Sequence, residues 1–191
     1  MYYTSLCGFH DLAKSLVVKH PQHAGAICGF YLSPLVAALA GNHFRIAQLL
    51  RDSGADPDIR GNTMRTPLHS AAYYGNPQLV QKLIELGADV NAQDKLGRTP
   101  LYNTSERSHL EDIGVVPLLL ENGADVNLRT RDGSTPLHHV SYWGSIEVAR
   151  LLLEHGADIK VEDDEGRTPI QVASAKKNAE MTKLLSEYST K

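Results

Sequence analysis

The residues of this sequence best suited to chemistry are nine histidines and two cysteines, and five of them gather near the N-terminus. Cys7, His10, His20, His23 and Cys28 lie within 22 residues. Thiolates and imidazoles hold structural zinc in a tetrahedron, usually as two close pairs. Cys7–His10 and His20–His23 have such short spacings, but Cys28 stands alone, so we expect no metal here and a core role for Cys7. A zinc-stabilised module remains a remote alternative.

Motifs for other kinds of catalysis are missing from the sequence. No Gly-x-Gly-x-x-Gly phosphate loop follows a strand-like run, and no Gly-x-Ser-x-Gly nucleophile elbow occurs. The acidic run 162–165 lacks the alternating ligands and the closing glutamate of a calcium loop, so we expect a solvated turn. We therefore predict that the protein is not an enzyme and needs no cofactor.

Composition narrows the class of partner and the compartment. The 191 residues are 42% apolar and 21% charged, with a net charge of −3, as in a folded, soluble chain. This slightly acidic balance argues against a nucleic-acid partner, and no apolar run is long enough to span a membrane. Two cysteines and no visible secretory signal predict an intracellular protein, with the cytoplasm favoured over the nucleus.

The prolines and glycines repeat at a fixed interval. Five prolines follow Ser or Thr, at Pro34, Pro67, Pro100, Pro136 and Pro169, with spacings of 33, 33, 36 and 33 residues. Gly-Ala-Asp occurs four times, with spacings of 33, 36 and 33 residues. Both series contain the same interval of 36, so one unit carries a three-residue insertion. A period of this length indicates a solenoid of one repeated supersecondary unit.

Each unit predicts two short helices and an extended turn. Thr66 is suited to cap a helix, and Pro67 fits its first position, where the missing N–H costs nothing. Pro77 begins a second helix, which Gly87 ends in a left-handed conformation. The turn 90–98 then leads to the next Thr-Pro. Such a unit cannot bury its own apolar face, so neighbouring units must stack.

These motifs resemble the ankyrin repeat. The resemblance is carried by Thr-Pro-Leu-His at 66–69, by Gly-Ala-Asp-Val-Asn at 87–91 and 123–127, and by the period. It implies an all-α fold, an ankyrin-repeat solenoid of helix-turn-helix units with projecting β-hairpin-like turns. It also implies a single domain, 1–191, with units 1–29 (partial), 30–62, 63–95, 96–131 (with the insertion), 132–164 and 165–191 (a C-terminal cap). His69 and His138 would be hydrogen-bonding struts between units. Independently of the resemblance, we expect the side chains of Asn91 and Asn127 to make local turn hydrogen bonds.

The unit 96–131 departs most from the family pattern. It has Tyr102 in place of the histidine, polar residues at 103–105, and the insertion near 106–112. Pro117 would clash inside a helix, so we expect the second helix to begin close to it. We predict that this unit is the weakest of the stack.

The positions that the repeat leaves variable carry charge and aromatic rings. The turn tips 58–65, 91–98 and 127–134 have a net charge of +3, whereas 160–167 has −2. The basic candidates for partner binding are Arg60, Arg65, Lys95, Arg98, Arg129 and Arg131. The aromatic candidates, at exposed positions late in the first helices, are Tyr73, Tyr74, Tyr102, Tyr142 and Trp143. His139 would be partly exposed beside them.

Two interpretations of these residues stay open, ordinary solvated turns with rings between helices, or a binding surface. Tyr and Trp are the side chains most enriched at binding hot spots, and the charges cluster along one edge. We therefore predict a monomeric protein-interaction module that binds a peptide or protein partner on its concave face. The alternative is a sensor or scaffold array from a larger multidomain signalling protein, because residues 11–50 resemble C-terminal arrays of fungal NACHT-type signalling proteins.

Overall fold

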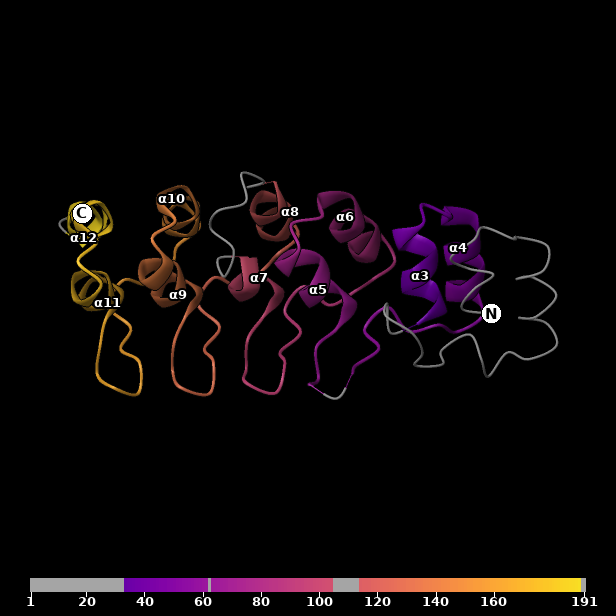
Figure 1. The fold of residues 1–191 in the computed structure, drawn as a ribbon, viewed down its shortest axis with the longest axis horizontal. Coiled ribbons are helices and arrows are strands. Elements are labelled where there is room, and N and C mark those ends of the chain that lie inside the picture. The colour runs from indigo at the N-terminus through magenta and orange to yellow at the C-terminus, as the bar shows by residue number, and fades with distance from the viewer. Residues whose placement is uncertain (1–32, 62, 105–113, 190–191) are drawn as a thin grey trace. The chain divides into compact units, whose positions relative to one another are not determined.

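The computed structural model describes residues 33–61, 63–104 and 114–189 (Figure 1). The chain divides into two compact units: unit 1 takes the described residues of Met1–Leu68 and Gln78–Asp89, and unit 2 those of His69–Pro77 and Val90–Lys191. The boundary therefore falls inside two helices, α5 (Pro67–Tyr73) and α6 (Pro77–Glu85). The zinc candidates at 7–28 and the insertion at 106–112 lie outside the described residues.

In unit 1, helices α3 (Pro34–Ala40) and α4 (Phe44–Asp52) pack against each other. The Ser33 hydroxyl accepts a hydrogen bond from the Val36 N–H at 3.3 Å, and Pro34 takes the first helical position. This is the cap that the Ser-Pro and Thr-Pro pairs predict. Helix α4 is amphipathic and buries Ile46, Ala47 and Leu50.

Unit 2 consists of helix pairs packed in sequence, as predicted. The pairs are α7 (Pro100–Asn103) with α8 (Val115–Glu121), α9 (Pro136–Trp143) with α10 (Ile146–Glu154), and α11 (Pro169–Ala175) with α12 (Ala179–Ser189). The first helices α7, α9 and α11 pack in one row, and α8, α10 and α12 form a second row, which lies above the first in Figure 1. The contact between the two rows buries a leucine-rich core. Among the described residues, no helix is both long enough and apolar enough to cross a bilayer.

Three loops of unit 2, the hairpins 91–98, 127–134 and 160–167, project to the same side of these helices (Figure 1). Each is closed by a backbone hydrogen bond of 2.9–3.0 Å between an N–H and a carbonyl four residues later. The next-to-last residue of each hairpin is a glycine, Gly97, Gly133 or Gly166, with φ between 72° and 78°. That left-handed conformation is open to glycine at little cost.

The hairpin 58–65 of unit 1 breaks this rule. Its backbone is closed in the same way, from Gly61 N–H to Arg65 O at 3.3 Å. At the position of the three glycines it has Met64, with φ of 60°. A side chain in this region clashes with its own backbone, so the hairpin holds local strain.

Histidine struts join consecutive repeats of unit 2, which confirms the prediction for His69 and His138. The Nε2 of His69 lies 2.9 Å from the carbonyl oxygen of Arg98, and the Nε2 of His138 lies 2.9 Å from that of Arg167. Burial lowers the pKa of His138, although the hydrogen bond to Arg167 opposes this shift. Both histidines are therefore structural.

The side chains of Asn91 and Asn127 reach beyond the local turn bonds that were expected. The Asn91 amide donates to Gly123 O at 3.0 Å, and its oxygen accepts from the Asp125 N–H at 2.8 Å. Asn127 makes the same two bonds with the backbone of the following repeat, at Gly156 and Asp158. These asparagines bridge consecutive repeats because their side chains reach the residues that follow the next helix pair.

The repeat 96–131 has the shortest described helix. Helix α7 has four residues, and α8 begins at Val115, two residues before Pro117, as expected. Asn103 is fully buried, and within the described residues its side-chain amide has no hydrogen-bond partner. An unsatisfied buried amide costs stability, which supports the prediction that the repeat 96–131 is the least stable of the stack.

Candidate functional site

A cavity of about 350 Å³ opens in unit 2 where two hairpins meet two first helices. We call it the hairpin pocket. It is lined by Leu96 and Arg98 of the first hairpin, Tyr102 of α7, Thr130, Arg131 and Asp132 of the second hairpin, and His139 of α9. Three of these seven residues, Arg98, Tyr102 and Arg131, were predicted from the sequence as binding residues.

Backbone contacts fix the spacing of the two hairpins. The Arg131 N–H donates to Leu96 O at 2.8 Å. A Cβ on Gly97 would lie 3.0 Å from both the Arg131 nitrogen and the Thr130 Cα, so only glycine allows this close approach. The result is that an exposed aliphatic side chain, Leu96 (52% exposed), and an arginine stand at one opening.

The floor of the pocket is aromatic. Tyr102 is only 8% exposed, and its ring centroid lies 4.2 Å from that of His139. Trp143 donates its indole N–H to His139 Nε2 at 3.1 Å. Tyr102 was expected at an exposed position. It is buried instead because its ring packs against His139, and it reaches solvent through the pocket.

His139 is partly buried and neutral. Burial, aided by the positive charge of Arg98, lowers the pKa of His139 to about 4. The indole hydrogen bond requires a lone pair on Nε2, so the proton of the neutral ring is on Nδ1. The floor therefore carries no charge at neutral pH.

Arg98 is held by an ion pair inside its own hairpin. Its Nε and Nη2 donate to Asp94 Oδ2 at 3.0 and 2.9 Å, while the N–H groups of Leu96 and Arg98 donate to Oδ1. Burial raises the pKa of Asp94, but the hydrogen bonds from Arg98 and Leu96 outweigh it, so the net shift is downward. The positive charge of Arg98 is thus largely balanced within the hairpin.

The same pair recurs as Arg167 and Asp163 in hairpin 160–167. Arg167 donates to Asp163 Oδ2 at 2.9 Å and pairs with Glu165 at 2.7 Å. Asp163 is buried, so the prediction of a solvated turn at 162–165 is wrong for this residue. Its carboxylate accepts two backbone N–H groups of the hairpin and holds its shape.

Other charges at the hairpins are exposed. Arg129 donates to Glu162 O at 2.8 Å, whereas within the described residues the side chains of Lys95 and Arg131 make no hydrogen bond or ion pair. The Asp132 carboxylate accepts the Thr130 hydroxyl. Among the described residues that line the pocket, Arg131 is therefore a positive charge that makes no ion pair.

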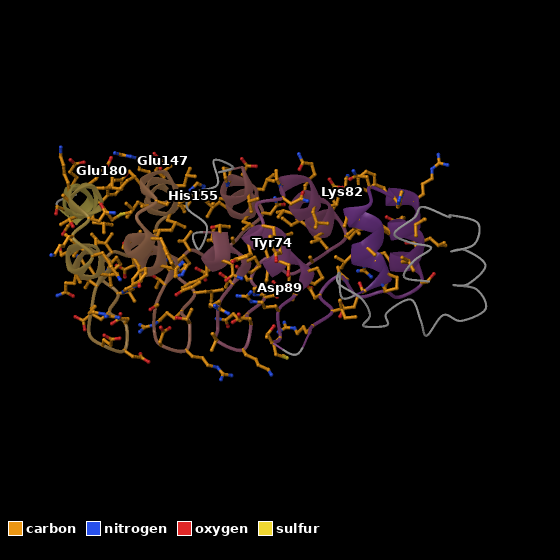
Figure 2. All side chains as sticks on the ribbon, in the orientation of Figure 1. Tyr74, Lys82, Asp89, Glu147, His155 and Glu180 are labelled. Atoms are coloured by element: carbon orange, nitrogen blue, oxygen red, sulfur yellow. The ribbon has the colours of Figure 1, made fainter. Side chains whose placement is uncertain are left out.

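The remaining predicted residues lie in separate groups. Tyr142 and Trp143 are exposed at the end of α9, with ring centroids 5.2 Å apart and Lys176 Nζ 3.6 Å from the Tyr142 centroid. Tyr73 and Tyr74 pair with each other at 5.2 Å, and Tyr74, labelled in Figure 2, is the more exposed.

Arg60 and Arg65 belong to unit 1, where both are half-buried. Of the predicted set, the structure thus brings Arg98, Tyr102 and Arg131 together at the hairpin pocket, and Arg60 and Arg65 are not among the residues that line it.

Sequence reasoning missed Leu96, Thr130, Asp132 and His139 as pocket residues. The signal for Leu96 was present, since a leucine at a solvent-facing turn tip is unusual for a merely solvated loop.

The described residues contain no candidate metal site: across 33–61, 63–104 and 114–189, no three His, Cys, Asp or Glu lie close enough to hold a metal.

The consecutive helix pairs of unit 2, each preceded by a projecting hairpin, define a helical repeat protein. The family description "Ankyrin repeats (3 copies)" matches residues 1–94, 68–163 and 108–191, and the chain belongs to the ankyrin repeat family. Ankyrin repeats are generally protein-binding modules, and the family is typically without catalytic activity.

A curated relative is the mouse protein "Ankyrin repeat and SAM domain-containing protein 6", which is 36% identical over 85 residues. The match covers 44% of this chain and 10% of the relative, so it spans about a tenth of that protein's length. The comparisons support the ankyrin family and give no support to a fungal NACHT-type origin.

Proposed function

We propose that the protein is an interaction module that holds a peptide or protein partner on the concave face formed by the hairpins and first helices of unit 2. The observation that carries this proposal is the hairpin pocket. It places an exposed leucine, a neutral aromatic floor and an arginine whose side chain has no partner within 33–61, 63–104 and 114–189 at one opening. Aromatic residues and arginine are both enriched in protein interfaces.

The charges of unit 2 favour one direction for the partner. Hairpins 91–98 and 127–134 together have a net charge of +2, and hairpin 160–167 has −2. The pairs Asp94–Arg98 and Asp163–Arg167 cancel within their hairpins, so the exposed residues at the tips carry this difference. An extended segment that is acidic at one end and basic at the other complements it, mainly through steering and orientation.

Two other predicted contacts of unit 2, Tyr142 and Trp143, extend this face. Trp143 donates a hydrogen bond to His139 of the pocket, and the ring of Tyr142 contacts that of Trp143. Tyr73, Tyr74, Arg60 and Arg65 remain predicted contacts that are not assigned to this site. A sensor or scaffold array within a larger signalling protein is the second candidate, favoured by the relative, whose name adds a SAM domain to its ankyrin repeats. An intracellular, monomeric module stays a prediction from cysteine usage and composition.

Affinity capture from a cell lysate, followed by mass spectrometry and titration of the purified partner, tests the proposal. We expect Trp143→Ala to weaken binding about 10-fold or more, as loss of a hot-spot aromatic does. Phe44→Ala is a matched control, because Phe44 in unit 1 is 45% exposed and Trp143 is 47% exposed. Equal loss of binding in both variants, or in neither, would argue against this face.

A further inference from the structure

We infer that the hairpin pocket is an anchor subsite for one large apolar side chain of the partner, followed or preceded by an acidic residue that pairs with Arg131. This inference rests on the proposed function and gives the chemical class of the partner: an extended peptide with an adjacent apolar and acidic residue.

The size and walls of the pocket fit one side chain. About 350 Å³ is near the lower end of the range for ligand sites, which suits a single aromatic or branched aliphatic group. Leu96 offers an exposed aliphatic wall, and the ring of Tyr102 offers an aromatic one. Covering them removes apolar surface from water, which supplies the affinity.

The pocket is preformed. Tyr102 stacks on His139, His139 accepts the indole N–H of Trp143, and a backbone bond joins Leu96 to Arg131. Few rotamers need to be ordered when a ligand enters, so little of the contact energy is spent on reorganisation. His139 stays neutral in this arrangement and does not repel an apolar group.

The charge next to the pocket selects an acid. Arg98 is balanced by Asp94, and Asp132 keeps its negative charge while it accepts the Thr130 hydroxyl. Arg131 and the neighbouring Lys95 exceed Asp132 by one positive charge, so together they can bind a carboxylate. A guanidinium binds a carboxylate through two parallel hydrogen bonds and fixes its orientation. A basic residue at the same place would meet two positive side chains.

Panning a phage-displayed library of random 12-residue peptides on the immobilised full chain tests the inference. We expect enriched peptides to share a large apolar residue next to Asp or Glu. Synthetic versions, labelled with fluorescein and titrated by anisotropy, should bind about 10-fold more weakly to Leu96→Gln and to Arg131→Glu. Replacing the peptide acid by lysine should weaken wild-type binding and restore binding to Arg131→Glu.

Arg150→Glu is the control for net charge, since Arg150 is exposed on α10 and does not line the pocket. Circular dichroism checks that each variant is folded. Equal weakening by Arg131→Glu and Arg150→Glu, or no rescue by the lysine peptide, would overturn the inference.

Enriched peptides that lack the apolar-acidic pair but still require Trp143 would overturn the subsite and leave the proposed function standing. A library that yields no binder would count against both.

Discussion

Met64 is expected to weaken the hairpin 58–65, and removing its Cβ should strengthen it. The three equivalent positions of unit 2 are glycines with φ of 72–78°, whereas Met64 has φ of 60°. A left-handed conformation costs a residue with a Cβ roughly 1–2 kcal/mol. Glycine gives back about 0.5–1 kcal/mol through the freedom of its unfolded chain. Met64→Gly should therefore stabilise the protein by about 0.5–1 kcal/mol.

Urea unfolding followed by far-ultraviolet circular dichroism measures this change. For a slope of about 2 kcal/mol per molar, the midpoint should rise by about 0.3–0.5 M. Met64→Ala is the matched control, because it removes the same long side chain and keeps the Cβ. Its midpoint should stay level or fall.

The reciprocal change at Gly97 sharpens the test. Gly97→Ala introduces the left-handed cost, and its Cβ also comes within 3.0 Å of the neighbouring hairpin, so it should destabilise more than Met64→Gly stabilises. If Met64→Ala stabilises as much as Met64→Gly, the side chain and not the backbone conformation is responsible, and the reasoning fails.

Three further predictions concern two carboxyl groups and the stability of the repeat 96–131. Burial raises the pKa of Asp58, so its ionisation costs stability as pH rises from the ordinary pKa through the folded one. Asp58→Asn should therefore raise the free energy of unfolding more at pH 7 than below pH 3.8, and a pH-independent difference in denaturant titrations would contradict this. The pKa of Asp94 is lowered, so its ionised form stabilises the fold above pH 3.8, and this stabilisation is lost as pH falls through the folded pKa. In Asp94→Asn, the free energy of unfolding should therefore fall less steeply with decreasing pH in this acid range than it does in the wild type. Amides of α7 should exchange with deuterium faster than those of α9, and equal protection would refute the weak repeat.

The sequence predicted the helix ends because their causes are local. Pro34 begins α3 as expected, and the glycines of the Gly-Ala-Asp tripeptides, Gly54, Gly87, Gly123 and Gly156, all have φ of 84–88°. The strut role of His69 and His138 followed from the family pattern and is confirmed. These features depend on residues within one repeat or on its fixed period.

Features that depend on neighbouring repeats were harder to predict. Tyr102 is buried because a partner ring, His139, comes from the following repeat. Asn91 reaches a carbonyl 32 residues away, which a local turn rule does not consider. The charge count gave equal weight to Arg98, which is paired with Asp94, and Arg131, which has no ion pair in the part of the chain that the structure describes.

The central claim is that a partner binds over the hairpin pocket of unit 2, and Trp143 reports on it directly. As the only tryptophan in the sequence, it gives one indole N–H resonance, and this N–H donates to His139 at the pocket. In a nitrogen-15 NMR titration with the captured partner or a selected peptide, we predict that this resonance shifts together with the amides of Leu96 and Arg131. Saturated binding that leaves these three signals unmoved, and shifts only amides of α8, α10 or α12, would contradict the claim.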